Sequence, residues 1–546
     1  MRSNLQKYLY ETGLFLFLIP CLVFVIGTLF LCIGLPLIGI ILPLSCLGAA
    51  FWVLKTSVWE EKWKRSLISF GIGLTALFFS MLIAGMYFDC SFDGQWYHQD
   101  AIMFLADGWN PFWDAEIPNN LVSGLNANYV NHYPKMSWIV EAVFFNFSGN
   151  IEHAKSLHLL FATSAFLLGF DFLVQRVLLS PWKAILISLL LNTSTITLGQ
   201  MFSFYVDGIL YSLLLLFIIF LIGFVFELPR YNVYLLLSFI GLANIKFTGL
   251  IYGIVLLFFA WLWVVLYKKK RVLSLSVGFL FLILIGAGMI GYPTYVRNTI
   301  SKGHPFFPIM GKHNEGKMIA EVQYPKDFFN RTRVEKLIRA HGSIPLYTDH
   351  EHASVTKPLF NSGLIKNSLA YYRNHQPVTM SPFGPIEAEL WLAFIPLLIL
   401  CFLLRPPVEW WWVMSALIIS LLIQPECWNL RYSPQLLLII ALVMVPIYIK
   451  ANRWITLAAS VFIVVFIFNG WFAVRENWRW VHDHTQMLNK ELEPLRNKSV
   501  VIQAGWMHSF SLKLKTYRIS PQKNNTSSED LVPFKGDDFT GWKHKK

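Results

Sequence analysis

The stretch SLISFGIGLTALFFSMLIAGM at residues 66–86, followed at once by YFDCSFDGQWYHQD at residues 87–100, decides the fold class. The first part carries no charge and is long enough to cross about 30 Å of hydrocarbon as a helix. The second part places two carboxylates, Asp89 and Asp93, directly beyond that run. Acids so close to hydrocarbon are costly unless they are solvated or paired, so both are candidates for a functional role.

The composition extends this interpretation to the whole chain. Of the 546 residues, 55% are hydrophobic and 14% are charged, whereas soluble domains carry about 25% charged residues. The first apolar block is followed by another and not by a small-residue cleavage site, so we expect a retained helix rather than a signal peptide. The apolar blocks predict about thirteen spanning helices, with approximate cores at 13–32, 34–54, 66–87, 155–175, 183–201, 208–226, 231–248, 250–267, 273–294, 388–404, 410–424, 434–449 and 454–473.

The net charge of +13 sets topology and does not indicate nucleic-acid binding, because the basic residues lie mostly in short loops. Under the positive-inside rule these residues share the cytoplasmic face. They are Arg2, Lys7, Lys55, Lys62, Lys64, Arg65, Arg176, Lys183, Arg230, Lys268, Lys269, Lys270, Arg271, Arg405, Lys450 and Arg453. We therefore expect a multi-pass protein of a bacterial inner membrane, with a cytoplasmic N-terminus and an extracytoplasmic C-terminus.

This topology divides the chain into a membrane core with large external segments. The predicted parts are an N-terminal hairpin (1–65), a core (66–295) with an acidic external loop (88–152), a long external loop (296–386), C-terminal spans (387–474) and a small extracytoplasmic region (475–546).

Four shorter patterns lie within the predicted external segments. Met136–Phe147 is apolar but too short to cross, and is expected as a helix lying at or dipping into the membrane interface. In the last part, Asn477–Leu495 has a helical pattern and Ser499–Gln503 resembles a strand, while the Lys-rich end could be disordered.

The six cysteines have no metal-binding or CxxC spacing. Four lie in predicted spans and are expected to pack as small apolar residues. Cys90 and Cys427 map to the same outer face, where a disulfide is conceivable, although sequence supplies no geometry for it.

Further polar residues stand at the predicted outer ends of spans. Each has an ordinary interpretation: Lys and Arg snorkel to water, Asp207 caps a helix, and His304 supports a Pro-rich turn. These ordinary interpretations do not explain why the residues converge on one predicted face. A carboxylate that acts as a base and a cationic clamp for phosphate together suit a lipid-phosphate donor and a hydroxyl acceptor. The motifs are YVDG with Asp207, NIKFTG with Lys246, YVRNTISKGHPFFP with Arg297 and His304, and WNLRYSPQ with Arg431 and Tyr432.

With these motifs in their order, the chain resembles the GT-C membrane glycosyltransferases over roughly residues 66–450. Members carry an essential acid in the first large external loop, which Asp89 and Asp93 match in position. YVDG and NIKFTG look like a paired signature of many bacterial members, and WNLRYSPQ is similar to an Arg-Tyr motif of a late external loop. The acidic loop here follows the third predicted span rather than the first, which an added N-terminal hairpin explains.

The resemblance implies a transfer of sugar from a polyprenyl-phosphate donor to a glycan, lipid or protein acceptor, with inversion, in cell-envelope assembly. Asp93 is favoured over Asp89 as the base because it stands in the denser motif with Gly94, Tyr97 and His98. The expected substrate-binding residues are Tyr97, His98, Asp207, Lys246, Arg297, His304, Arg431 and Tyr432. Magnesium or manganese at Asp89, Asp93, His98 and Asp207 is compatible with the sequence but not required by it.

Two other classes stay open. A transporter or flippase would place its charges nearer the midplane, on broken helices in repeated halves. An O-antigen polymerase or ligase would depend instead on Arg and His residues of the long loop, which holds Arg297, His304, Arg331, Arg333, Arg339 and His341.

Overall fold

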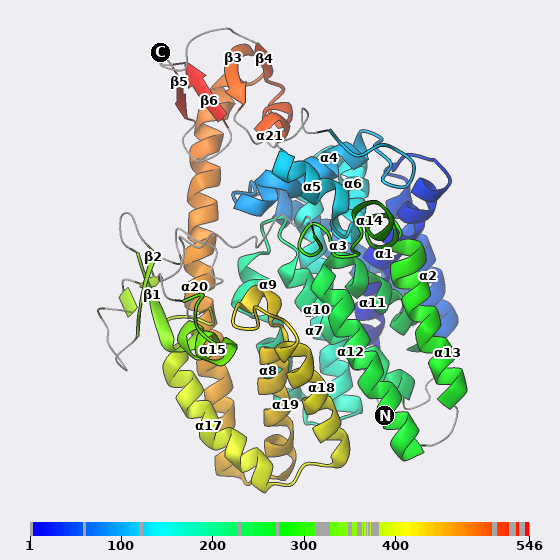
Figure 1. Cartoon of the computed structure of the whole chain (residues 1–546), viewed down its shortest axis with the longest axis vertical. Coiled ribbons are helices and arrows are strands. Elements are labelled where there is room, and N and C mark those ends of the chain that lie inside the picture. The colour runs from blue at the N-terminus through cyan, green and yellow to red at the C-terminus, as the bar shows by residue number, and fades with distance from the viewer. Residues whose placement is uncertain are drawn as a thin grey trace.

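A computed structural model of the chain is mostly helical (Figure 1). The N-terminus lies toward the lower end of the view in Figure 1 and the C-terminus at its top. The residues that the structure describes are 4–57, 62–118, 124–225, 231–268, 272–312, 328–347, 352–356, 363, 365–366, 368–369, 372, 382–504, 510–522, 531–533 and 541–544.

The first half of the chain forms one packed group of helices. In it α1 packs against α2, α3 and α7, while α10 packs against α7 and α11. The members are α1 (Asn4–Cys32), α2 (Ile41–Thr56), α3 (Lys62–Gly85), α7 (Ser156–Gln175), α8 (Pro181–Asn192), α9 (Thr195–Gly199), α10 (Asp207–Val225), α11 (Tyr231–Ile245), α12 (Phe247–Trp263) with η3 (Val264–Lys268), and α13 (Val272–Ile283) with η4 (Leu284–Ile290).

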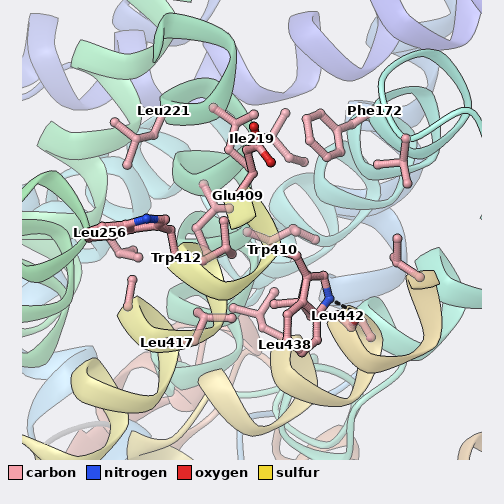
Figure 2. A pocket seen from close by; sticks show the side chains of 18 of the residues that line it. Phe172, Ile219, Leu221, Leu256, Glu409, Trp410, Trp412, Leu417, Leu438 and Leu442 are labelled. Carbon is pink, nitrogen blue, oxygen red and sulfur yellow. Dashed lines mark hydrogen bonds between the residues drawn. The ribbon is translucent and has the colours of Figure 1, made fainter. Parts of the chain in front are cut away.

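The second half adds four long helices. Here α18 packs on α12, and α19 and α20 pack on α8. An apolar cavity lies among α7, α8, α10, α12, α18 and α19 (Figure 2). The members are α17 (Glu387–Leu403), α18 (Val408–Leu422), the short turn η6 (Leu430–Tyr432), α19 (Gln435–Lys450), and α20 (Arg453–Leu492) with η7 (Glu493–Leu495).

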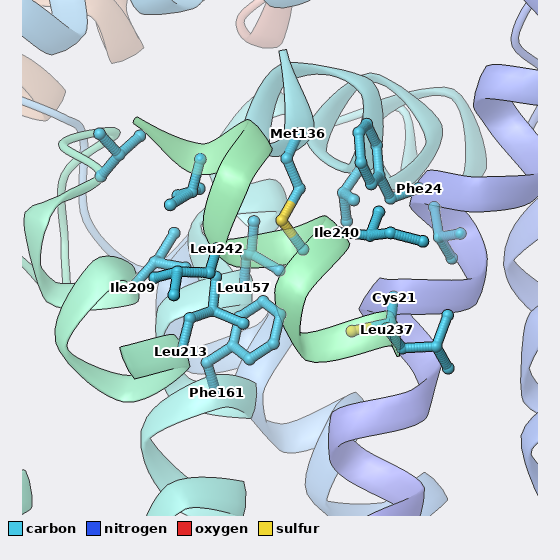
Figure 3. Close-up of a cluster of buried hydrophobic side chains, with 14 of the residues drawn as sticks. Cys21, Phe24, Met136, Leu157, Phe161, Ile209, Leu213, Leu237, Ile240 and Leu242 are labelled. Carbon is cyan, nitrogen blue, oxygen red and sulfur yellow. The ribbon is translucent and has the colours of Figure 1, made fainter. Parts of the chain in front are cut away.

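Apolar side chains from α1, α6, α7, α10 and α11 form the largest core (Figure 3). Phe24, Phe161 and Leu213, from three of these helices, are at most 2% exposed. In a bilayer such side chains stabilise the fold mainly through close van der Waals packing, because the surrounding lipid chains are just as apolar.

Each of the predicted spans corresponds to a helix, but their lengths differ. Among the described residues, seven helices are long and apolar enough to cross a membrane, and five shorter apolar ones have 10–17 residues. The predicted span 183–201 is in fact broken between α8 and α9. The membrane character is therefore supported, while the number of thirteen spans stays a prediction.

Two lysines predicted to be cytoplasmic donate hydrogen bonds to backbone carbonyls near other residues of the same predicted set. Lys183 Nζ donates to the carbonyl of Tyr448 at 2.6 Å, and Lys450 Nζ donates to the carbonyl of Arg405 at 2.8 Å. These contacts agree with the predicted grouping of those loops, whereas the membrane side that they face stays a prediction.

The acidic external loop folds into helices instead of lying open. They are η1 (Gly94–His98), α4 (Gln99–Ala106), α5 (Gly124–His132), α6 (Met136–Ser148) and η2 (Ile151–Lys155). The expected helix at Met136–Phe147 is thus present, but its residues 136–144 are buried against α1, α4 and η2. It packs inside the protein and does not lie on its surface.

The long external loop contributes α14 (Tyr295–Lys302), α15 (Arg333–Gly342) and an antiparallel pair, β1 (Ser343–Tyr347) with β2 (His352–Thr356). A capping box between Thr332 and Glu335 starts α15. At its end, His341 pairs with the buried Glu387 at the start of α17.

The C-terminal region is more ordered than the sequence suggests. The predicted span 454–473 and the predicted helix Asn477–Leu495 are one continuous helix, α20, followed by the short η7. The strand expected at Ser499–Gln503 is present, and the Lys-rich end also contributes strands. With α21 (Phe510–Thr516) there is a sheet in the order β4-β3-β6-β5, made of β3 (Ser499–Ala504), β4 (Ser520–Gln522), β5 (Leu531–Pro533) and β6 (Gly541–His544) (Figure 1).

A buried ion pair joins α1 to α3. Glu11 is 1% exposed and accepts hydrogen bonds from Arg65 Nε at 3.1 Å, Ser57 at 2.9 Å, Ser66 at 3.2 Å and Ser69 at 3.3 Å. Every carboxylate oxygen is therefore occupied, which offsets the cost of removing the charge from water.

We expect Glu11→Ala to lower the free energy of unfolding by about 3–5 kcal/mol, because it strands the buried Arg65 guanidinium. Ser69→Ala removes one neutral donor and should cost about 1 kcal/mol. Equilibrium unfolding in mixed micelles with a denaturing detergent compares the two. Equal stability of Glu11→Ala and the wild type would contradict the structural role of the pair.

Candidate functional site

Four charged side chains that are distant in sequence meet in one cluster. Arg431 donates from Nη2 to Asp93 Oδ2 at 2.7 Å and from Nε to Asp207 Oδ2 at 2.8 Å. Lys246 Nζ pairs with the other oxygen of Asp207. Two carboxylates and two cations therefore form one connected, formally neutral network, called here the Asp93–Arg431 cluster.

Each member stands where a helix begins or where the chain breaks between helices. Asp207 is the first residue of α10. Lys246 has extended dihedrals, φ −160° and ψ 149°, which separate α11 from α12. Arg431 lies in the turn η6 before α19, where its backbone N–H donates to the side chain of Asn429. The local conformation thus aims all three side chains at the same point.

Asp207 is the most buried member, with 0% exposure. Gln200, which sequence reasoning missed, donates from Nε2 to Asp207 Oδ2 at 2.9 Å and accepts from the N–H of Gly208 at 3.0 Å. A Cβ at Gly208 would stand only 3.2 Å from the backbone of Thr197, so a glycine suits this close approach. Both oxygens of Asp207 are occupied, which makes this residue an anchor for the cations.

Tyrosine rings flank the two cations. The Arg431 guanidinium carbon lies 4.5 Å from the ring centroid of Tyr205, and Lys246 Nζ lies 4.2 Å from that of Tyr432. Such contacts stabilise a cation by about 0.5–2 kcal/mol. Of the predicted binding residues, Tyr432 therefore belongs to the cluster, while Tyr205 was missed although it stands in the YVDG motif.

Asp89 and Asp93 occupy different environments. Asp89 is 0% exposed and accepts from the N–H of Ser91 at 2.7 Å and of Phe204 at 3.1 Å. Burial raises the pKa of Asp89 to about 6, with the Lys155 ammonium opposing the rise. A side chain at Gly94 would overlap the Asp89 carboxylate. Asp89 thus holds two backbone segments together, and Asp93 alone of the two reaches Arg431.

Tyr97 and His98 lie in the same π-helix but are engaged in packing. Tyr97 is 3% exposed and packs among aromatic rings, including those of Tyr129 and Trp138. His98 accepts at Nδ1 from Trp138 Nε1 at 2.7 Å. Burial lowers the pKa of His98 to about 3, so the imidazole stays neutral near pH 7.

Arg297 and His304 do not bond to the cluster. The guanidinium of Arg297 donates to the carbonyls of Pro111 at 2.6 Å and Asp114 at 2.9 Å. His304 Nδ1 accepts from the N–H of Phe306 at 3.1 Å. Both residues support loops in these contacts. The sequence motif predicted an external segment for both residues but gave no information on their hydrogen-bonding partners.

The described residues contain no group of three or more His, Cys, Asp or Glu side chains that could hold a metal ion. Arg431 and Lys246 occupy the oxygens of Asp207, so fixed cations stand where a divalent ion would bind these carboxylates. The six cysteines are free, which excludes the Cys90–Cys427 disulfide in this structure.

The C-terminal region contacts the segment that carries Asp89 and Asp93 and also the chain ahead of Asp207. No sequence motif indicated these contacts. Lys513 of α21 is 2% exposed and donates to Gln95 Oε1 at 2.8 Å, two residues beyond Asp93. Thr485 of α20 accepts from the N–H of Phe88 at 3.1 Å. Trp478 donates to the carbonyl of Leu198 at 2.9 Å, ahead of the Asp207 motif.

No protein-family model matches the chain, and no curated protein or solved structure is significantly similar to it.

Removal of the Asp207 charge should destabilise the protein. We expect Asp207→Asn to cost about 3–5 kcal/mol of unfolding free energy, since Lys246 loses its carboxylate partner and Arg431 keeps only Asp93. In a double-mutant cycle with Lys246→Met, the losses of unfolding free energy caused by the two substitutions should be coupled by about 1–3 kcal/mol. Unfolding of the two single variants and the double variant measures this coupling, and additive losses would exclude a direct pair.

The raised pKa of Asp89 predicts a stability that depends on pH. The folded state binds this proton more tightly than the unfolded state, whose carboxyl has a pKa near 3.8. Stability from this group is therefore complete below about pH 4 and is lost as pH rises through about 6, by up to about 3 kcal/mol. Unfolding midpoints between pH 4 and 7 should fall more steeply in the wild type than in Asp89→Asn. An unchanged slope would remove Asp89 as the source.

Proposed function

We propose that this chain is an integral membrane glycosyltransferase that moves a sugar from a polyprenyl-phosphate donor to an acceptor hydroxyl at the external membrane face. One observation carries the proposal: Asp93 and Asp207 share Arg431, with Lys246 on the far side of Asp207, where predicted spans begin. A carboxylate next to two phosphate-binding cations at that depth suits a lipid-phosphate donor.

The base is assigned to Asp93. Among the described residues, the Asp93 side chain makes a single hydrogen bond, through Oδ2 to Arg431, whereas both carboxylate oxygens of Asp207 and of Asp89 are engaged. A donor phosphate that attracts Arg431 would release Asp93 to accept a proton. Asp93 is 7% exposed, so little water competes for that proton.

The reaction follows from these roles. Asp93 takes the proton of the acceptor hydroxyl as its oxygen forms a bond to the anomeric carbon. The bond from that carbon to the phosphate oxygen breaks on the opposite side, and its electron pair leaves with the polyprenyl phosphate. Arg431 and Lys246 stabilise the charge that develops there. Attack opposite to the leaving group inverts the anomeric carbon.

Asp207 acts through the cations in this scheme. It keeps Arg431 and Lys246 beside the place proposed for the donor phosphate, so Arg431 shifts only when the donor binds and both cations are in position when charge develops. Arg297, by contrast, bonds to loop carbonyls and is assigned to loop support and not to the phosphate clamp.

The ligase interpretation receives less support from the long loop. Arg297, His304 and His341 bond to three different partners: the acidic loop, a local turn and Glu387. A transporter would concentrate charge near the midplane, whereas the Asp93–Arg431 cluster stands at helix starts.

The proposal predicts that Asp93→Asn lowers transfer by at least about 100- to 1,000-fold, the effect of losing one key polar group of a transition state. Arg297→Gln should retain most activity. Transfer of radiolabelled sugar from polyprenyl-phosphate donors to extracted envelope acceptors, in proteoliposomes, measures both. Thermal unfolding of Asp93→Asn shows that it has folded.

The opposite pattern favours the ligase class, with Asp93→Asn active and Arg297→Gln inactive. Donor-dependent transport without a covalent product favours the transporter class. Either result would exclude the proposed role of Asp93.

A further inference from the structure

The apolar cavity among α7, α8, α10, α12, α18 and α19 has a volume of about 300 Å³ (Figure 2). Its wall is formed by aliphatic and aromatic side chains, among them Phe172, Ile219 and Leu417. A dry engineered cavity half this size already binds small apolar molecules. Water would find almost no hydrogen-bonding partners on such a wall, so the cavity suits hydrocarbon.

The cavity lies away from the Asp93–Arg431 cluster along the same helices. On α10 its lining runs from Leu215 to Val225, and on α12 from Leu256 to Trp263. The lining therefore begins eight residues after the start of α10 and nine residues after the start of α12. At 1.5 Å per residue, this places it about 12–14 Å along each helix from the end that bears the cluster. The lining then reaches the opposite helix ends.

Aromatic side chains mark the membrane interface at that far end. Trp263 and Trp412 line the cavity, and their ring centroids are 5.9 Å apart. Tyr267 stacks on Trp263 at 4.2 Å and meets Trp412 at 6.0 Å. Trp and Tyr gather at the level of lipid head groups, so the rim of the cavity stands at head-group depth.

Two opposite charges stand at the same rim. Glu409 lines the cavity in the first turn of α18 and is labelled among the lining residues in Figure 2. Lys268 ends η3 and donates from Nζ to the carbonyl of Val225, another lining residue, at 3.1 Å. A carboxylate for an ammonium and an ammonium for a phosphate complement a zwitterionic head group.

We propose that this cavity binds a phospholipid with a primary amine in its head group, such as phosphatidylethanolamine. One hydrocarbon chain fills the cavity, the phosphate meets Lys268, and the lipid ammonium meets Glu409. The site faces the leaflet opposite to the Asp93–Arg431 cluster and is independent of the proposed transferase reaction.

The test uses the full-length protein, reconstituted in vesicles of equal parts phosphatidylethanolamine and phosphatidylglycerol. After re-extraction in detergent, mass spectrometry measures the lipid that the protein retains. We expect retained phosphatidylethanolamine to exceed phosphatidylglycerol by about two- to fivefold, as one partly exposed ion pair would give. Glu409→Gln should lower this ratio to that of the vesicles while total lipid is retained.

Variants that fill the cavity test the chain-binding part. Ala260→Phe and Ala416→Phe place a ring into it from two different helices, and both should lose the retained lipid. Ile419→Phe on the exposed side of α18 is the matched control and should retain it. Thermal unfolding confirms that each variant is folded.

Three results would overturn the site: a retained ratio equal to that of the vesicles in the wild type, a preference for phosphatidylglycerol, or equal lipid retention in the filled variants and the control.

Discussion

The buried carboxylate of Asp207 is the constraint on which the site depends. A charge with 0% exposure at the edge of a membrane protein is tolerated only with counter-charges and donors around it. Arg431, Lys246 and Gln200 meet that requirement. Arg431 comes from the turn before α19, Lys246 from the break between α11 and α12, and Gln200 from the chain before α10. Pairing the Asp207 charge therefore brings these helix ends together.

The same helices have opposite characters at their two ends. At one end they meet in ion pairs, and toward the other they surround an apolar cavity with an aromatic rim. Charged side chains and the apolar cavity are thus separated along the helix axes, as expected for a protein whose surroundings include both water and lipid. A lipid-linked reaction at one end and a bound lipid at the other are compatible with this division.

Sequence patterns predicted the helices more accurately than they predicted the contacts between residues. The predicted apolar runs correspond to helices, although the run 183–201 is broken between α8 and α9, and the motifs around Asp207, Lys246 and Arg431 identified residues that do meet. Arg297 had an equally suggestive motif yet bonds to carbonyls of the acidic loop. The external position of Arg297 stays a prediction, and its hydrogen-bonding partners depend on how the acidic loop folds. The continuity of α20 was missed for a similar reason, since polar residues beyond Ala473 do not interrupt helical hydrogen bonds.

By itself the sequence determined a mostly helical chain with membrane-length apolar helices, because apolar run length sets what can cross hydrocarbon. It also narrowed the acids to Asp89 and Asp93. Only the tertiary structure separated these two: Asp89 is held by the backbone of Ser91 and Phe204, and Asp93 by Arg431. The physical reason is that Phe204 and Arg431, the partners that distinguish the two acids, lie 115 and 338 residues away from them in sequence, and no local pattern encodes such contacts.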